Sequence, residues 1–428
     1  MIGMMRTVIY IPKNSVARVA GPASLRVVSG KISVVGKILG VNDEATISLY
    51  RSYPVYALED SSIEVLLGES GYIEYPKERD EVSLEWIRVA NEITEKGSRI
   101  IIMGPVESGK TTLSTLLLNT ALSKGLKPCV IDADIGQQDI SLPDFVSLSC
   151  PREPVIWLRE LMPDEIRIIG SLTPSQYSSR IIAATIDLVQ RAFERGGEVI
   201  IVNTDGWVSH PSAIEMKLDI ARYMRATHII VLQKDLFTTP IENSLVTAKI
   251  IKLSSPQNVR TRSREDRKLL RAHAYKKFFE NSSMRQIDLR RVLVIGSCLF
   301  AGEPLKPEQY QELEKIVNGK IEYGSVLDNT IYLYVRSGEK ISPEKQVIRH
   351  MGYEINIIPA GAEKGLIISI LNRDLREVAP GIIDELRPSE GVMRILTSYQ
   401  GEIGGVVVGR VKIDSAYDDS TRFSKCVV

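Results

Sequence analysis

Residues 99–111 read RIIIMGPVESGKT, an apolar strand that runs straight into a glycine-rich loop. Residues 104–111 satisfy the pattern GxxxxGK[ST], which occurs once in the chain. The leucine-rich stretch 111–124 predicts a helix that ends at Gly125. A loop of this kind surrounds phosphate oxygens with backbone N–H groups, and the helix N-terminus adds a positive dipole. The flanking strand and helix argue against a chance match, so we expect nucleotide phosphates to bind here.

Different residues of the loop are expected to contact different parts of the nucleotide. Lys110 is expected to reach the β- and γ-phosphates, and the Thr111 hydroxyl is expected to bind Mg²⁺. The predicted nucleotide-binding set is Gly104, Pro105, Val106, Glu107, Ser108, Gly109, Lys110, Thr111 and Thr112.

A second stretch, VIDADIGQQDI at residues 130–140, ends an apolar strand with two aspartates. The strand follows Lys110 at a distance that leaves room for one crossover helix. Asp132 fits the carboxylate that holds Mg²⁺, directly or through water. Residues two apart project to the same side, so Asp134 also faces the phosphates. We interpret Asp134 as a general base for an attacking hydroxyl, with a solvated loop aspartate or a helix N-cap as the alternative.

Strands and helices alternate from residue 99 to about residue 290, which indicates a parallel sheet with crossover helices. The flanking regions read as short strands separated by turn residues. We therefore predict an α/β fold in which a central P-loop domain with a parallel sheet is flanked by β-rich domains, and the DxD spacing of Asp132 and Asp134 favours a P-loop kinase domain. The predicted division is an N-terminal β domain at 1–80, the P-loop domain at 81–290 and a C-terminal β-rich domain at 291–428.

Composition sets limits on the partners. The 428 residues are 44% hydrophobic and 25% charged with a net charge of +1, so an anionic partner must meet a local patch. No signal peptide and no apolar run of about 18 residues is visible, and no membrane partner is expected. The four cysteines show no CxxC spacing. They predict reduced thiols and a cytoplasmic location, with a nuclear location left open.

Residues 260–277, RTRSREDRKLLRAHAYKK, carry eight Lys or Arg against two acids. Ser263 and Asp266 resemble a capping box, which places the helix start there. The segment is either a solvated surface helix or part of a lid, at 256–280, that closes over the phosphates. An arginine delivered by such a lid contributes about 10³–10⁵-fold in rate in related P-loop systems.

Taken together, GPVESGKT, DADIGQQDISLP, LTPSQYSSR, NTDGW and the basic helix resemble the polynucleotide 5′-hydroxyl kinase family. Its members include the kinase subunit of eukaryotic pre-mRNA cleavage factor, nucleolar rRNA-processing kinases and archaeal RNA kinases. The resemblance spans residues 20–415. It implies ATP and Mg²⁺ as cofactors, direct in-line transfer to the 5′-hydroxyl end of RNA with DNA left open, and protein partners in RNA processing.

The resemblance also implies roles for single residues. Gln137 would line the RNA path, and Thr173 and Pro174 match a clasp segment near the RNA 5′ end. Trp207 matches the aromatic side chain on which a terminal base stacks, a sequence-tolerant contact. A core tryptophan after a buried strand is the alternative for Trp207.

The predicted catalytic set is Asp134, Lys110, Arg262 and Arg267, of which the two arginines match the lid spacing of the family. Two other functions stay open. One is a nucleotide-bound scaffold in an RNA-processing complex that has lost turnover. The other is a P-loop ATPase or GTPase switch that hydrolyses nucleotide without transferring it.

Overall fold

The computed structural model describes residues 5–76, 81–232, 247–256, 262–336, 347–421 and 428. They form two compact units, each of which is built from several separate segments of the chain. The first comprises residues up to 141, 146–165 and 173–267, and the second comprises 142–145, 166–172 and 268–428. The three-domain division read from the sequence stays a prediction.

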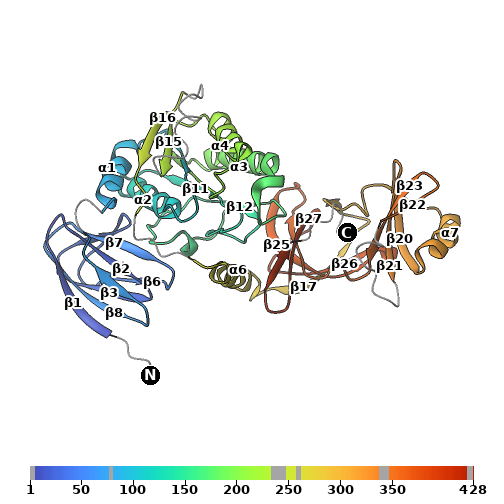
Figure 1. The fold of residues 1–428 in the computed structure, drawn as a ribbon, viewed down its shortest axis with the longest axis horizontal. Helices are drawn as coiled ribbons and strands as arrows, with labels where there is room; N and C mark the ends of the chain where they lie inside the picture. The colour runs from blue at the N-terminus through green and yellow to red at the C-terminus, as the bar shows by residue number, and fades with distance from the viewer. Residues whose placement is uncertain (1–4, 77–80, 233–246, 257–261, 337–346, 422–427) are drawn as a thin grey trace. The chain divides into compact units, whose positions relative to one another are not determined.

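Two antiparallel sheets open the first unit, in blue in Figure 1. Their orders are β1-β8-β3-β6 and β5-β4-β7-β2-β9. Buried and part-exposed positions alternate along β7 and β8, because one face of each strand is in the core. The strands are β1 (Met5–Ile11), β2 (Val16–Ala20), β3 (Ala23–Ser29), β4 (Ile32–Val34), β5 (Lys37–Leu39), β6 (Glu44–Ile47), β7 (Ser52–Ala57), β8 (Ser61–Leu67) and β9 (Tyr72–Glu74).

The central sheet of the first unit has the order β12-β11-β14-β10-β15-β16. All of its pairs are parallel except that of β11 with β12. Its inner strands are apolar and buried along nearly their whole length, as expected of a parallel sheet covered on both faces. The strands are β10 (Arg99–Met103), β11 (Pro128–Ala133), β12 (Phe145–Ser149), β14 (Val199–Thr204), β15 (His228–Leu232) and β16 (Lys249–Leu253).

Helices connect these strands and fix the edge at which the site forms. The helices are α1 (Ser83–Ile93), α2 (Lys110–Ser123), α3 (Ser178–Glu194) and α4 (Pro211–Tyr223), with short 3₁₀ turns η2 (Leu158–Glu160) and η3 (Pro174–Gln176). Strands β10, β11 and β14 are parallel neighbours, so their carboxyl ends lie at one edge of the sheet. The phosphate loop, the acidic stretch and the NTDGW segment follow these three ends.

One core links the N-terminal sheets to the central sheet. Val34 and Leu39 belong to the same buried cluster as Leu116 and Leu117 of α2. The side chain of Asn119 donates to the carbonyl oxygens of Val35 at 2.8 Å and Val155 at 2.6 Å. The N-terminal strands are therefore fixed against the helix that follows the phosphate loop.

The second unit is rich in strands, in agreement with the pattern after residue 290. Its sheets have the orders β17-β26-β25-β24-β27-β18, with β28 on β27, and β19-β20-β21-β23-β22. No helix in the described ranges is long and apolar enough to cross a membrane. The elements are β13 (Glu165–Ile168), α6 (Arg264–Phe279), β17 (Ser283–Asp288), β18 (Leu293–Ile295), β19 (Glu303–Pro304), α7 (Pro307–Val317), β20 (Lys320–Leu327), β21 (Thr330–Arg336), β22 (Val347–His350), β23 (Tyr353–Pro359), β24 (Leu366–Leu371), β25 (Glu377–Arg387), η5 (Pro388–Glu390), β26 (Val392–Thr397), β27 (Gly405–Ile413) and β28 (Asp419–Thr421); β13 and α6 begin in the first unit.

The expectation of reduced cysteines is wrong for two of the four. Cys129 and Cys150 form a disulfide, and Cys298 takes part in no disulfide. The antiparallel register of β11 with β12 pairs Val130 with Ser149, so the next residues outward lie opposite each other. Because strand pairing brings these two cysteines together, no short sequence motif such as CxxC marks the disulfide. The cytoplasmic location loses this support and stays a prediction.

Candidate functional site

The phosphate loop leaves β10 and closes around its own lysine. Gly109 has φ +96°, and a Cβ there would lie 2.6 Å from the Trp86 ring, so only glycine fits. The Lys110 Nζ donates to the carbonyl oxygens of Gly104 at 2.9 Å and Pro105 at 2.7 Å. Burial lowers the pKa of Lys110 to about 8. The loop thus presents a buried ammonium group that phosphate oxygens can bind in place of the carbonyls.

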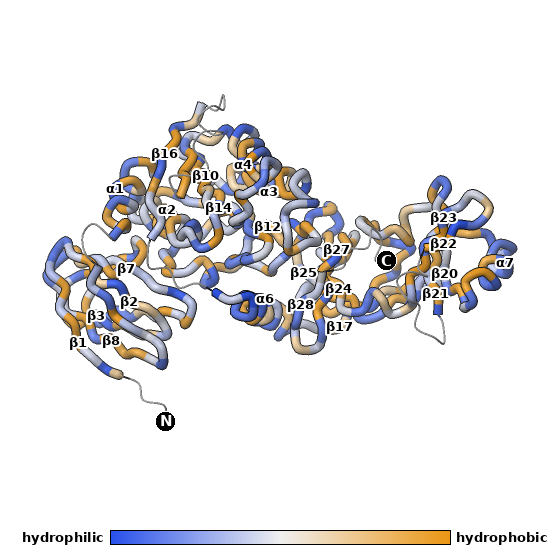
Figure 2. Tube along the Cα trace, in the orientation of Figure 1, coloured by the Kyte–Doolittle hydropathy of each residue, from blue (hydrophilic) through white to orange (hydrophobic). Residues whose placement is uncertain are grey.

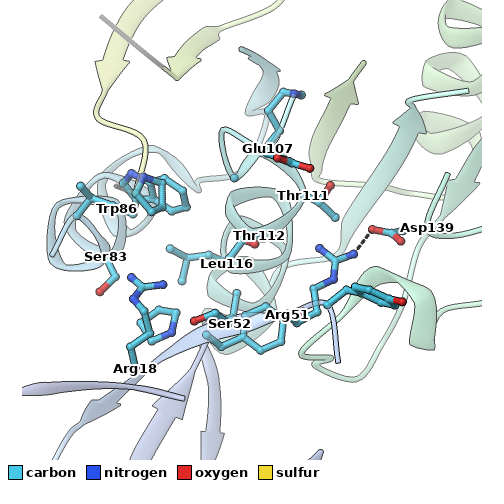
Figure 3. Close-up of a pocket in the computed structure, with 18 of the residues that line it drawn as sticks. Arg18, Arg51, Ser52, Ser83, Trp86, Glu107, Thr111, Thr112, Leu116 and Asp139 are labelled. Carbon is cyan, nitrogen blue, oxygen red and sulfur yellow. Dashed lines mark hydrogen bonds and ion pairs between the residues drawn. The ribbon is translucent and has the colours of Figure 1, made fainter. Parts of the chain in front are cut away.

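A cavity of about 150 Å³ lies beside this loop, entirely within the first unit. Figure 3 shows Arg18, Ser83 and Trp86 toward one end and Thr111, Arg51 and Asp139 toward the other. Residues of the N-terminal strands therefore share the cavity wall with the phosphate loop. The predicted site residues on this wall are Val106, Glu107, Gly109, Lys110, Thr111, Thr112, Asp134, Gln137, Arg262 and Arg267.

Asp132, the penultimate residue of the strand β11, accepts hydrogen bonds from three other residues. It is fully buried and does not line the cavity. Its Oδ1 accepts from the Asn203 side chain at 2.9 Å and from the Asp134 backbone at 3.3 Å, and its Oδ2 accepts from the Asp139 backbone at 2.9 Å. Burial, with help from Asp134 and Asp139, raises the pKa of Asp132 to about 8. Its part in holding Mg²⁺ stays a prediction.

Asp134 lies on the cavity wall with its carboxylate oriented by backbone groups. Its Oδ1 accepts from the backbone N–H groups of Gly136 at 3.2 Å and Gln137 at 3.0 Å. No described residue donates to its Oδ2. Burial and the charge of Asp205 raise the pKa of Asp134 to about 6, against the opposing effect of Lys110. This side chain is neither a helix N-cap nor turned out to solvent, and the open oxygen suits a proton acceptor.

The basic helix begins where the capping box predicts. The Asp266 backbone donates to the Ser263 hydroxyl at 3.0 Å, and the Ser263 backbone donates to the Asp266 carboxylate at 2.9 Å. Figure 2 shows α6 as mostly hydrophilic. Lys268 and Arg271 form ion pairs in the second unit, so part of the charge of the helix is already offset. Residues 257–261 of the predicted lid lie outside the described residues.

Both predicted catalytic arginines contact the phosphate loop through one carboxylate. The Glu107 Oε1 accepts from the Arg262 backbone at 2.9 Å and from the Arg267 guanidinium at 3.1 Å. Glu107 itself has φ +63°, a left-handed backbone conformation that is uncommon for residues other than glycine. The sequence placed Glu107 among the nucleotide contacts; the structure adds that it joins the loop to the start of α6.

Trp207 follows β14, and the residue before it, Gly206, lies against Val106 of the phosphate loop, but Trp207 does not line the cavity. Its backbone N–H donates to Asp205, and its ring stacks on His210 at 5.9 Å between centroids. The fully buried Lys217 donates to both the Asp205 carboxylate and the Trp207 carbonyl, each at 2.8 Å. Thr173, just before η3, is exposed and also lies off this wall, as does Pro174. Their contacts with RNA stay predictions.

The sequence motifs assigned no role to Asp139 or to the two arginines that bind it. Arg51 donates to Asp139 at 2.6 Å and Arg159 donates to it at 3.1 Å, and both guanidinium groups lie over the Trp157 ring. Burial alone would raise the pKa of Asp139, but Arg51, Arg159 and Arg262 together lower it to about 2. Asp139 is the third acid of VIDADIGQQDI and could have been noticed. Arg51 lies 88 positions earlier and carries no motif.

The residues present fit a nucleotide with Mg²⁺. Among the described residues, no three His, Cys, Asp or Glu side chains are grouped to hold a metal ion by themselves. Mg²⁺ at nucleotide sites takes one or two protein ligands and completes its shell with water and phosphate oxygens. Thr111 lines the cavity and follows Lys110 in the chain, and its hydroxyl is the group that binds Mg²⁺ in this motif.

Known proteins resemble this chain in sequence and fold. A polyribonucleotide 5′-hydroxyl-kinase of Methanocaldococcus jannaschii is 29% identical over 329 residues, which cover 75% of this chain and 88% of that protein. One of Pyrococcus furiosus is 28% identical over 324 residues, covering 74% and 88%. The solved structure of wild-type Clp1p in complex with Pcf11p covers 95% of this chain and 98% of its own, with a TM-score of 0.64 at 15% identity.

These likenesses agree with the residues described above. The Clp1p structure shows the same fold, which confirms the predicted α/β architecture with β-rich flanks. Residues 104–281 match the family described as mRNA cleavage and polyadenylation factor CLP1 P-loop. This match and the archaeal relatives confirm the resemblance drawn from the motifs of the chain.

Proposed function

We propose that this protein transfers the terminal phosphate of ATP to the 5′-hydroxyl end of RNA, with DNA left open as a second acceptor. The observation that carries the proposal is the open Oδ2 of Asp134 on the wall of the cavity that contains Lys110. A hydrolase needs only a positioned water there. An oriented carboxylate with a pKa of about 6 suits the removal of a proton from an alcohol.

The transfer is a single in-line displacement. The 5′-oxygen of the acceptor bonds to the γ-phosphorus, the bond from that phosphorus to the β–γ bridging oxygen breaks, and ADP leaves. Asp134 accepts the proton of the attacking hydroxyl. Lys110 exchanges the loop carbonyls for phosphate oxygens, and Arg267 exchanges Glu107 for the transferring group, where charge develops.

Thr111 and Asp132 are the residues that would hold Mg²⁺, Asp132 directly or through water. When bound, the ion neutralises negative charge on the β- and γ-phosphate oxygens. Asp132 also keeps the backbone of Asp134 and Asp139 in place through its two oxygens, a role that needs no metal.

The RNA contacts and partners extend the proposal. Gln137 lies on the cavity wall next to Asp134 and would line the RNA path. Thr173 and Pro174 would contact the 5′ end, and Trp207 would stack on the terminal base. The structurally similar Clp1p was solved with Pcf11p, which supports protein partners in RNA processing for this chain as well.

One assay tests the function against its alternatives. The protein is incubated with γ-labelled ATP, Mg²⁺ and a 5′-hydroxyl RNA oligonucleotide, and the label is followed. Label on the RNA supports the kinase. Free labelled phosphate indicates the hydrolytic switch. Bound nucleotide with no movement of label indicates the scaffold.

A further inference from the structure

Three arginines surround one aspartate where the N-terminal strands meet the acidic stretch. We call Arg51, Arg159, Arg262 and Asp139 the arginine cluster. Arg51 and Arg159 bond the two oxygens of Asp139. Burial is the main cause that lowers the pKa of Arg262, to about 10. Asp139, Arg51 and Arg159 also affect this pKa, so Arg262 lies close to all three. The four side chains of the cluster together carry a formal charge of about +2, and Glu107 beside Arg262 offsets part of it.

Two nitrogen donors in the cluster have no acceptor. Arg51 is 8% exposed, and its Nε and that of Arg262 are buried without a hydrogen-bond partner among the described residues. A buried charged donor without an acceptor is costly, so such groups in native proteins usually mark an absent ligand or water. The positive charge of the cluster favours an anion as the acceptor of these two donors.

The cluster faces the cavity. Arg51, Asp139 and Arg262 all line it, and Figure 3 shows Arg51 bonded to Asp139 beside Thr111. Planar guanidinium groups match the oxygens of a phosphate in a two-point contact. The Trp157 ring, 4.5 Å from the Arg51 guanidinium, and Asp139 together fix the orientation of that group before any ligand binds.

The cluster is also attached to the residues of the proposed transfer. The Asp139 backbone donates to Asp132, and the same loop carries Asp134 and Gln137. The ATP phosphates already have the loop backbone, Lys110 and Thr111. A phosphate that belongs to the acceptor strand must lie near Asp134, on the loop to which the cluster is fixed.

We propose that Arg51 and Arg262, oriented by Asp139 and Arg159, form a second phosphate subsite beside the P-loop. Its ligand is a substrate phosphate. The position on the loop of Asp134 favours the phosphodiester that follows the 5′-terminal nucleotide of the acceptor, and the γ-phosphate of the nucleotide is the other source. The acceptor assignment rests on the proposed function. The subsite makes the N-terminal strands part of the active site.

The test measures binding, without turnover, on the full chain. Wild type, Arg51→Gln and the control Arg26→Gln, an arginine of the same N-terminal sheets away from the cavity, are titrated with a non-hydrolysable ATP analogue and with a short 5′-hydroxyl RNA. We expect Arg51→Gln to weaken RNA binding by about 10- to 100-fold. It should also reduce the slope of log K against log salt by about 0.7, the value for one lost phosphate contact on a single strand.

The binding results distinguish the two sources of the phosphate and can overturn the subsite. Weaker RNA binding with a reduced slope supports the acceptor phosphate, and weaker binding of the ATP analogue alone supports the γ-phosphate. Unchanged binding of both ligands, or weaker binding with an unchanged slope, overturns the subsite. If Arg51→Gln does not fold, Arg51→Lys keeps the charge and should weaken binding with the slope intact; no weakening in that variant overturns the two-point contact.

Failure of the proposed function gives a different result. If wild type moves no label from ATP to RNA while Arg51→Gln still changes the salt slope, the subsite stands and the transfer does not. If wild type transfers label and Arg51→Gln matches it in binding and in KM for RNA, the transfer stands and the subsite does not.

Discussion

Replacement of Asp134 by asparagine is the most direct test of the chemistry. Asparagine has the same shape, and its amide oxygen can still accept from the backbone of Gly136 and Gln137, so the loop should keep its conformation. What disappears is the proton acceptor. A general base contributes about 10²–10⁴-fold, which corresponds to roughly 3–5 kcal/mol of activation free energy at about 1.4 kcal/mol per decade.

The pH dependence adds an independent signature. Asp134 acts in its ionised form, so with a pKa of about 6 the wild-type rate should fall as the pH drops through that value. Below it the loss approaches about tenfold per pH unit. The asparagine variant should lack this acidic limb. Its ATP affinity should stay within about fivefold of wild type, because the P-loop contacts remain.

The assay is single-turnover transfer of label to a 5′-hydroxyl oligonucleotide between pH 5 and pH 8, beside equilibrium binding of ATP. Asp43→Asn is the matched control, since Asp43 accepts a backbone hydrogen bond in an exposed turn of the N-terminal strands. Transfer by Asp134→Asn at the wild-type rate, with the acidic limb intact, would refute the role of Asp134 as base.

Three further predictions test the surroundings of the site. Trp207→Ala should weaken RNA binding by about 1–3 kcal/mol with ATP affinity unchanged; a loss of ATP affinity alone, in parallel titrations, would make the side chain structural. Gly109→Ala should weaken ATP binding by about 1–3 kcal/mol through its ring clash, whereas Gly97→Ala, at a similar φ with nothing within 4 Å, should bind ATP normally in the same calorimetric titration. Reduction of the Cys129–Cys150 disulfide, which closes 21 residues, should remove about 3 kcal/mol of unfolding free energy; equal thermal midpoints with and without reductant would contradict this.

Short sequence motifs predicted the parts of the site that are formed by residues close together in the chain. The phosphate loop, the strand that ends near Asp132 and the capping box of Ser263 each depend on residues within a few positions of one another. Chain-local hydrogen bonds and the helix period determine such features, so a single sequence contains them.

Contacts between distant segments were not predictable in the same way. Arg51 meets Asp139 only because the N-terminal strands pack on α2, and nothing in the sequence near residue 51 distinguishes this buried arginine from the exposed ones. Cys129 and Cys150 are likewise brought together by strand register. The difference between Asp132 and Asp134 also depends on burial, because alternation alone placed both carboxylates toward the phosphates.

The hydrogen bonds of Lys110 to its own loop bear on how nucleotide exchanges. The ammonium group has two acceptors within its own loop, the carbonyl oxygens of Gly104 and Pro105. A departing nucleotide therefore leaves no stranded charge that would unravel the loop, and an arriving one swaps partners one for one. Because a nucleotide must displace these two hydrogen bonds when it binds, its affinity is lower and its release is easier. This suits a site that releases its product nucleotide after each turnover.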